Sequence, residues 1–456
     1  MKKTLFFAAA AIAMLASCSQ NDLEAPVVAQ SQQGDAIEFG TYLGKTPVSR
    51  AVAGQEGTMT TATMATTGFG VFAFYTGSDT YGQYQHTTYN GETAGESTAN
   101  QYPNFMYNQQ VTSSDSPTYA TWTYSPLKYW PNEFAAGAVD AQSPAAQGAA
   151  SKGKVSFFAY APYVSATGDA GIIGMSAKNA LGDPTITYKI SNVDLLWGTM
   201  DATKTKDIAN ASQNGVTGSS SATDGTYQKA VLDGETVAAD LTKQQTDGKI
   251  HFKFKHVLSA IAGTGGLKAQ ADPNNGSLTQ TKVSIESVTI SDATTNGNNE
   301  FTLNLATGQI VNKTGDGAVS SGNKTYATAD ILEDYAHVST PANWDAVKGL
   351  QDTSAHDILK EGKDPILFIP GATPTFNVNI KYTVWTKDDN LQDGWSKVPQ
   401  DITKQVTFTS EVQRGKRYIL LLKLGLEDVN FEALVTNWDD VDAAGNTIVN
   451  LPLNVE

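Results

Sequence analysis

Residues 250–257 read Ile-His-Phe-Lys-Phe-Lys-His-Val, so that apolar side chains alternate with polar ones. Because successive side chains of a β-strand point to opposite faces, this alternation predicts a strand with one buried face. A similar period recurs in residues 283–290 and 376–382, and glycine- and asparagine-rich turns separate the runs. Long stretches with a helical period are nearly absent. Many short strands between turns predict an all-β protein built from β-sandwiches.

The N-terminus has the features of a secretory signal peptide. Two lysines open the chain, residues 5–15 form an apolar run, and small residues lead into Cys18. The run is too short to cross a bilayer as a stop-transfer helix. Because this order resembles the lipobox of bacterial lipoproteins, we expect residues 1–17 to be removed and Cys18 to be acylated. The alternative is an ordinary signal peptide with a chance cysteine nearby.

The segment after the signal predicts how the protein is attached. Residues 18–34 are polar, glutamine-rich and without periodicity, which is typical of a flexible tether. A single acyl chain binds a membrane only marginally, whereas two or more bind it stably. Bacterial lipoproteins carry several chains on one cysteine, so the lipobox resemblance implies firm attachment to the outer membrane.

Several classes of chemistry are excluded by composition. Cys18 is the only cysteine in 456 residues, so the acylated chain has no thiol for disulfides, zinc–thiolate sites or cysteine catalysis. The five histidines lack metal-ligand spacing, and no nucleophile elbow, Walker loop or dinucleotide fingerprint is present. A formal net charge of −15 argues against a nucleic-acid partner. We therefore expect no metal, no cofactor and no enzymatic activity.

A polar, glycine-rich break suggests a division of the chain. Residues 314–325 follow a strand pattern that ends near residue 310. We therefore predict a large N-terminal β-sandwich domain over residues 35–320, with long loop insertions, and a smaller C-terminal one over residues 321–456.

Aromatic residues crowd the stretch between Tyr75 and Trp130. They either form a sugar-stacking platform on a monomeric surface glycan-binding lipoprotein, or they fill the core and cover the edges of a β-sandwich. The core interpretation is favoured, because aromatics are common in strands and single exposed tyrosines are ordinary. The residues concerned are Tyr81, Tyr84, Tyr89, Tyr102, Tyr107, Tyr119, Trp122, Tyr124, Tyr129 and Trp130.

Motifs in a fixed order resemble those of the fimbrillins, the type V pilins. They are YWP at 129–131, FFAYAP at 157–162, FKHVLSAI at 254–261, FIP at 368–370, GKRY at 415–418 and FEALVTNWDD at 431–440. The resemblance implies two transthyretin-like (Greek-key) β-sandwich domains in tandem. It also implies a pilus subunit on the cell surface that polymerises with other pilin subunits and contributes to adhesion, with a host or bacterial surface ligand.

The resemblance further implies a proteolytic maturation step. In the family, a trypsin-like protease cuts after an arginine near the N-terminus, and Arg50, followed by Ala51, occupies that place. The next arginines are Arg414 and Arg417, so an arginine-specific protease finds one site in the N-terminal region. The alternative is an incidental arginine in a loop.

The strand before the cut has apolar side chains to bury. Ile37, Phe39 and Leu43 alternate with other residues, which predicts a strand. According to the resemblance, maturation removes this strand and opens a groove, which a strand from the next subunit fills. Such a vacated edge exposes unpaired backbone groups and an apolar slot.

The C-terminus contains a candidate donor strand for this exchange. Leu451, Leu453 and Val455 alternate as a donor requires, although Ile448 is out of phase and Pro452 fits only an edge position. A tip or anchor subunit needs only one half of the exchange. The sequence leaves open whether the chain is a stalk, tip or anchor subunit.

Overall fold

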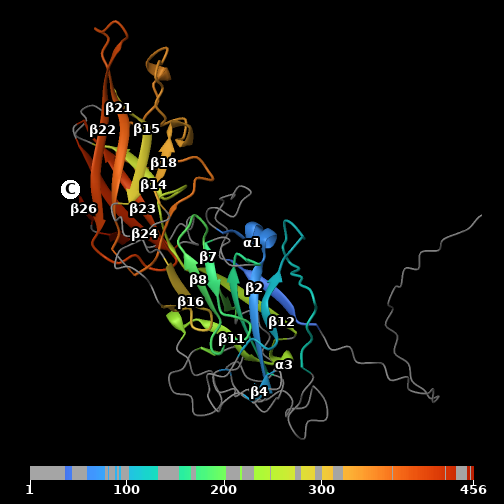
Figure 1. The fold of residues 1–456 in the computed structure, drawn as a ribbon. Helices are drawn as coiled ribbons and strands as arrows, with labels where there is room; N and C mark the ends of the chain where they lie inside the picture. The colour runs from blue at the N-terminus through green and yellow to red at the C-terminus, as the bar shows by residue number, and fades with distance from the viewer. Residues whose placement is uncertain are drawn as a thin grey trace, which may run out of the picture. The chain divides into compact units, whose positions relative to one another are not determined.

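The computed structural model shows a mostly β protein with several sheets (Figure 1). The described residues all belong to one compact unit, 35–456. No helix among them is long and apolar enough to cross a membrane. The structure describes residues 36–43, 59–77, 81, 88–89, 92–93, 102–131, 154–165, 171–201, 216–217, 231–246, 248–272, 279–292, 300–311, 322–371, 373–426, 428–437, 449–451 and 453–455.

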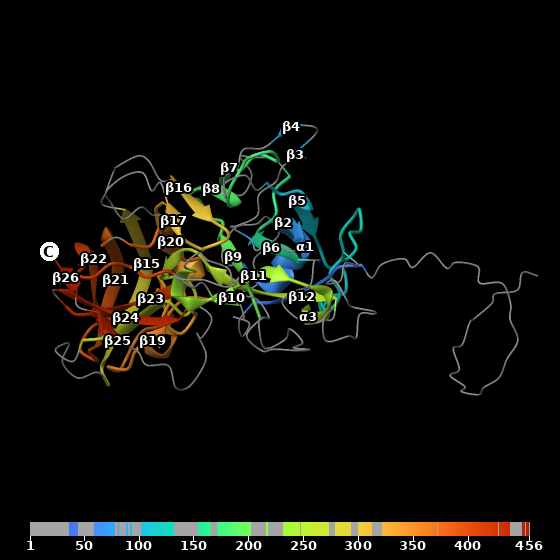
Figure 2. The same ribbon diagram turned by 90° about the horizontal axis from the view of Figure 1, so that it is seen from below.

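The first set of sheets comprises most strands up to residue 256, together with one later hairpin. An eight-stranded sheet has the order β1-β12-β9-β6-β11-β10, with β2 paired to β6 and to β5 (Figure 2). A four-stranded sheet has the order β17-β16-β8-β7. The eight strands are β1 (Glu38–Tyr42), β2 (Phe69–Gly77), β5 (Met106–Val111), β6 (Lys154–Ala161), β9 (Leu196–Met200), β10 (Val216–Thr217), β11 (Thr236–Leu241) and β12 (Lys249–His256). The four are β7 (Ile172–Met175), β8 (Thr185–Lys189), β16 (Glu300–Asn304) and β17 (Ile310–Val311), and β3 (Thr88–Tyr89) pairs with β4 (Glu92–Thr93).

The second set of sheets takes its strands from residues 259 onward. A seven-stranded sheet is built around β23, and a five-stranded sheet has the order β18-β15-β21-β22-β26. The seven are β13 (Ser259–Ile261), β14 (Leu267–Ala271), β19 (His356–Asp357), β20 (Ile366–Phe368), β23 (Lys416–Leu424), β24 (Val429–Asn437) and β25 (Val449–Leu451). The five are β15 (Thr281–Asp292), β18 (Lys324–Ala327), β21 (Thr375–Lys387), β22 (Trp395–Phe408) and β26 (Leu453–Val455).

Strand β12 has the alternation that its sequence predicts. Ile250, Phe252, Phe254 and His256 are buried, and the residues between them are only partly buried. Strand β6 lacks alternation because both of its faces are covered. Phe157 packs into a core with β1, whereas Phe158 packs into a second core shared with the four-stranded sheet.

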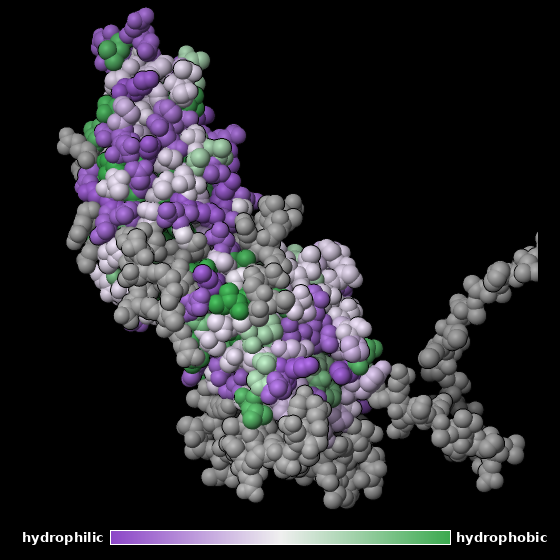
Figure 3. Space-filling model, in the orientation of Figure 1, coloured by the Kyte–Doolittle hydropathy of each residue, from purple (hydrophilic) through white to green (hydrophobic). Residues whose placement is uncertain are grey.

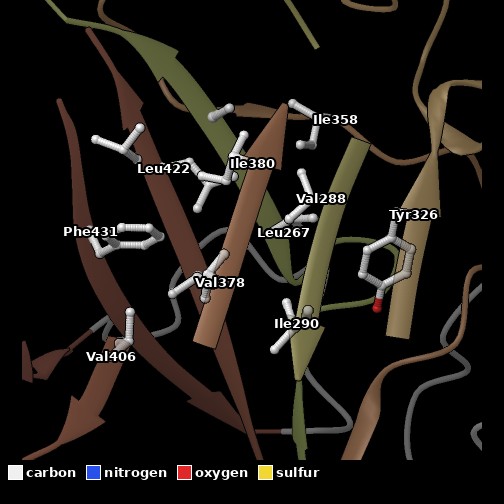
Figure 4. Packing of buried hydrophobic residues seen from close by; sticks show 14 of the residues in the cluster. Leu267, Val288, Ile290, Tyr326, Ile358, Val378, Ile380, Val406, Leu422 and Phe431 are labelled. Carbon is white, nitrogen blue, oxygen red and sulfur yellow. The ribbon is translucent and has the colours of Figure 1, made fainter. Parts of the chain in front are cut away.

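The five- and seven-stranded sheets share one hydrophobic core. Val288 and Ile380 from the five-stranded sheet meet Leu267 and Leu422 from the seven-stranded sheet (Figure 4). Strands β15, β21 and β22 lie side by side, as both ribbon views show. On the outward face, polar residues of β21 alternate with the buried ones, and Figure 3 shows the surface over β21 and β22 as largely hydrophilic.

The sheets do not change at the predicted boundary of residue 320. Strands β14 and β15 precede that residue, yet they pair with β23 and β21, which follow it. Strands β16 and β17 lie between them in sequence but belong to the sheet of β7 and β8. The chain therefore enters the second set of sheets at β13 and returns once to the first set. The division into domains at residue 320 stays a prediction.

Helix α1 (Thr61–Thr67) begins and ends with clear capping interactions. The hydroxyl of Thr60 accepts a hydrogen bond from the Thr63 N–H, and the Thr63 side chain accepts one from the Thr60 N–H. Gly68, at a φ of 83°, ends the helix in a conformation that favours glycine. Met64 and Ala65 are buried in the core that contains β1. The helix therefore covers one face of the eight-stranded sheet. Among the described residues, a second α-helix is α3 (Lys243–Thr246).

Asp240 is a buried carboxyl at an irregularity in β11, where the pairing with β6 shifts register. Its Oδ1 accepts a hydrogen bond from the Tyr81 N–H at 2.7 Å, and its own N–H donates to Ser156 Oγ at 2.8 Å. Its Oδ2 is buried without a hydrogen-bond partner among the described residues. Burial, opposed by the Tyr81 N–H and the charge of Lys154, raises the pKa of the carboxyl to about 7.

This raised pKa predicts a specific dependence of stability on pH. The folded chain holds the proton of Asp240 to a higher pH than the unfolded chain does, so raising the pH from about 4 to about 7 lowers the free energy of unfolding. The size of the pKa shift limits this loss in the free energy of unfolding to on the order of 4 kcal/mol. Asp240→Asn cannot ionise and should gain stability relative to the parent over this range, as measured by denaturant unfolding at several pH values. Asp393→Asn, at an exposed position, should show the same pH dependence of stability as the parent. A difference in the free energy of unfolding between Asp240→Asn and the parent that does not change with pH would contradict the assignment.

Candidate strand-exchange groove

Strand β1 lies at the edge of the eight-stranded sheet and pairs in parallel with β12, from Glu38 opposite Lys249 to Tyr42 opposite Lys253. Ile37, Phe39 and Leu43 are 1%, 1% and 4% exposed. The strand and its buried face are therefore as the sequence predicts. The removal of these three residues on maturation stays a prediction.

Phe39 is at the centre of an aromatic cluster. Its ring centroid lies 5.4 Å from that of Tyr124, 6.0 Å from that of Phe252, and 6.1 Å from those of Phe69 and Phe157. Edge-to-face pairs at such distances stabilise beyond their buried area. The side chain therefore fixes β1 to strands β2, β6 and β12 at once.

A second wall of the groove comes from residues 122–130. Phe39 forms an antiparallel bridge with Trp122. The Ile37 N–H donates to the Lys128 carbonyl at 2.9 Å, and the Tyr124 hydroxyl donates to the Ile37 carbonyl at 2.9 Å. Strand β1 thus has hydrogen-bonded neighbours on both sides, β12 and this segment. Without β1, the two walls would enclose an apolar slot.

Trp130 and Gly248 close one end of the groove. The Trp130 indole N–H donates to the Gly248 carbonyl at 2.9 Å, and the same oxygen accepts from the Glu38 N–H at 3.1 Å. In the sequence, only aromatic crowding and the YWP motif mark segment 122–130. The alternating Trp122 and Tyr124 were the available signal that it follows a strand edge.

Gly40 permits the close approach of β1 to β12. A Cβ at this position would lie 2.6 Å from Nδ1 of His251. Every other residue type therefore requires the imidazole to move. The groove therefore restricts which residue a strand can have at the outward-facing position of Gly40, as it does at the inward-facing position of Phe39.

The aromatic stretch is mostly core. Tyr81, Tyr102, Trp122, Tyr124 and Trp130 are buried, as the core interpretation predicts. The side chains of Tyr84 and Tyr89 lie outside the described residues. Tyr107 and Tyr129 are the members on the described surface, at 38% and 37% exposure, and Tyr119 is partly buried.

The candidate donor residues do not form one strand. Leu451 belongs to β25 and pairs with Ala433 of β24, whereas Leu453 and Val455 belong to β26 and pair with β22. Leu453 packs against the core of the second set of sheets, and Val455 is 37% exposed. The C-terminus thus contributes three residues to an edge of each sheet. Its donor role stays a prediction.

Arg414 and Arg417 are both held by the folded chain. The Arg414 guanidinium lies 4.9 Å from the centre of the Trp197 ring and donates to the carbonyls of Gly308 and His256. Arg417 is buried and donates to carbonyl oxygens of residues 262 and 264. Cys18, Arg50 and Ala51 lie outside the described residues. In the part of the chain that the structure describes, no three His, Cys, Asp or Glu side chains converge as metal ligands.

Truncation of Phe39 tests how strongly β1 is held. Phe39→Ala removes the ring from the cluster, and we expect β1 to be held less tightly by about 3–5 kcal/mol. Hydrogen exchange of the peptide covering residues 36–43 should then accelerate markedly. Glu38→Ala, at an exposed position on the same strand, should leave the exchange unchanged. Equal exchange rates for Phe39→Ala and the parent would show that other contacts hold the strand.

Comparison with known proteins shows similarity to fimbrial subunits over most of the chain. No protein-family model matches the chain. Fimbrium subunit Fim1C of Phocaeicola vulgatus is 26% identical over 396 residues, which are 84% of this chain and 85% of that protein. The crystal structure of a fimbrial protein from Bacteroides vulgatus aligns with 88% of this chain and 99% of that one, at a TM-score of 0.56 and 22% identity. A crystal structure from Bacteroides uniformis aligns with 90% of this chain and 99% of that one, at a TM-score of 0.33 and 12% identity. The resemblance to fimbrial subunits that the sequence motifs indicate is thus confirmed over most of the chain.

Proposed function

We propose that the chain is a structural, non-enzymatic subunit of a fimbrium that contributes to cell-surface adhesion. The similarity to a fimbrium subunit over 84% of the chain supports this assignment. The observation that carries the mechanism is β1: an edge strand, close to the N-terminus, whose side chains fill a groove with two hydrogen-bonding walls.

The proposed assembly step replaces β1 by a strand of another subunit. Loss of β1 exposes the unpaired backbone of β12 and the apolar contacts of Ile37, Phe39 and Leu43. Each of these side chains contributes about 1.5–3 kcal/mol on burial, and main-chain hydrogen bonds add to this. A strand that refills the groove therefore binds tightly without any other contact between subunits.

The proposed architecture is two transthyretin-like (Greek-key) β-sandwich domains in tandem. The support is that each set of sheets encloses a hydrophobic core between two sheets. In place of a single boundary at residue 320, and because β14 and β15 pair with strands that follow that residue, we propose that the first domain comprises the described residues 36–256 and 300–311. The second then comprises the described residues 259–292 and those from 322 onward. The pairing of β15 with β21 supports the assignment of residues 281–292 to the second domain.

The proposed maturation begins with lipidation at Cys18, which places the precursor on the outer membrane. Cleavage after Arg50 then separates residues 18–50, and with them β1, from the chain that begins at Ala51. The state of the other two arginines supports the choice of Arg50. Arg414 stacks on Trp197, and Arg417 is buried, so neither is offered to a protease in the folded chain.

The proposed partners are other pilin subunits, joined by strand exchange. Strands β25 and β26 are candidates for the donor, because each is a three-residue strand at a sheet edge. The rival function is a monomeric glycan-binding lipoprotein that uses the aromatic stretch. Processing at Arg50 discriminates between the two, since a glycan-binding lipoprotein gains nothing from the loss of its anchor.

Proteolysis tests the maturation step. Mild treatment with an arginine-specific protease should yield a chain that begins at Ala51, and oligomers should grow as β1 dissociates. Mass spectrometry identifies the cleavage, and light scattering after size exclusion measures the oligomers. Arg50→Lys keeps the charge and should block both effects. An Ala51 chain that has lost residues 37–43 and stays monomeric with excess donor subunits would refute strand exchange.

Lipidation is tested separately. Cys18→Ala should abolish incorporation of labelled palmitate and release the precursor from the membrane fraction, because Cys18 is the only thiol available for acylation. Cys18→Ser provides a nearly isosteric control with the same expected loss. Retention of the label in either variant would disprove the proposed acylation site.

A further inference from the structure

Strand β1 carries one polar residue on its inner face. Ile37, Phe39 and Leu43 pack into the same core, and Thr41 lies between the last two on the same face of the strand. The Thr41 Oγ1 is buried, and it has no hydrogen-bond partner among the residues that the structure describes. The Thr41 side chain as a whole is partly buried, and its hydroxyl lies on a face of β1 that is otherwise formed by apolar residues.

The wall formed by residues 122–130 also contains a buried polar group without a hydrogen-bond partner among the described residues. Trp122 is 5% exposed and bridges to Phe39, and its indole N–H is buried without an acceptor among the described residues. Other buried indoles differ in this respect. The N–H of Trp130 donates to Gly248, that of Trp197 to the Leu305 carbonyl at 2.8 Å, and that of Trp385 to Ser284 Oγ at 2.7 Å.

We propose that β1 is an imperfect occupant of its own groove, and that Thr41 and Trp122 determine which strand the groove prefers. The preferred occupant is an edge strand of another pilin subunit, with an aliphatic residue at the position of Thr41 and a hydrogen-bond acceptor facing the Trp122 N–H. This inference rests on the proposed exchange of β1.

The physical reason is the desolvation of groups that gain no partner. A polar group that loses water on burial without finding a new hydrogen bond destabilises the buried state. Each such group is expected to reduce the equilibrium constant for docking of β1 into the groove roughly tenfold. While β1 is covalently attached, its high effective concentration offsets this weakness. After the chain is cut, the weakness favours a better strand. Leu451, Leu453 and Val455 show that this chain contains a segment with aliphatic residues at three alternate positions.

Hydrogen exchange on the uncut, full-length chain tests the intrinsic weakness of β1. Thr41→Val keeps the shape and removes the hydroxyl, so exchange of the β1 amides should slow roughly tenfold. Thr41→Ser keeps the hydroxyl and should not slow it. As a matched control, Thr199→Val removes a hydroxyl that donates to the Lys253 carbonyl at 3.0 Å, and it should not slow exchange in any peptide. Unchanged or faster β1 exchange in Thr41→Val would overturn the proposal.

Exchange with an incoming strand tests the preference. After cleavage at Arg50, release of the β1 fragment, followed by mass spectrometry, should be roughly tenfold slower in Thr41→Val. A synthetic peptide of residues 35–44 with valine at position 41 should compete for the emptied groove roughly tenfold better than the parent peptide. Equal competition by the two peptides would overturn the proposal. If no peptide enters the groove at all, the proposed strand exchange fails, whereas the result on the uncut chain still decides the role of Thr41.

Discussion

The backbone of β12 must be covered, and much of the N-terminal structure depends on how this is achieved. Strand β12 pairs with β9 on one side and would be a sheet edge on the other. A long, partly apolar edge is a template for aggregation unless something pairs with it. Here β1 provides the pairing from the N-terminal end of the described chain, and the 122–130 segment closes over it. Strand β1 therefore lies beside β12 in the fold but far from it in sequence, so that a cut in the chain can separate the two.

The parts of this arrangement that follow from alternation were predictable, and those that follow from the choice of partner strand were not. Residues 250–257 and the 37–43 strand show a period of two, since each has one face in the core. Strand β6 shows none because both faces are buried. The return of β16 and β17 to the sheet of β8 has no local signal, because a strand of alternating residues fits the edge of many sheets. In the 122–130 wall, the alternating Trp122 and Tyr124 indicate a strand edge, but buried aromatics do not indicate which strand they contact.

Removing β1 need not disturb the chain that follows. Met59, on the C-terminal side of Arg50, donates its N–H to Asp194 Oδ2 at 3.3 Å, and the same oxygen lies 2.5 Å from Nδ1 of the buried His256. This polar pair ties the start of the α1 region to the end of β12 by contacts that do not involve β1. Met59 also packs in the core beneath the groove. Strand β12 is thus connected to the start of the α1 region through residues that remain after a cut at Arg50.

An exchangeable strand has to satisfy two opposing requirements. It must protect the edge during export, when exposed backbone and apolar surface would aggregate, and it must leave once a better strand is present. Apolar anchors such as Phe39 meet the first requirement, since aromatic contacts with four neighbours hold the strand while it is tethered. Unpaired polar groups such as Thr41 Oγ1 meet the second, since they lower the affinity without altering the shape of the strand. Covalent attachment favours the bound strand, because it raises the effective concentration of the strand at the groove without adding any contact. In the proposed mechanism, a single peptide-bond cleavage is then sufficient to convert a closed subunit into one that accepts another strand.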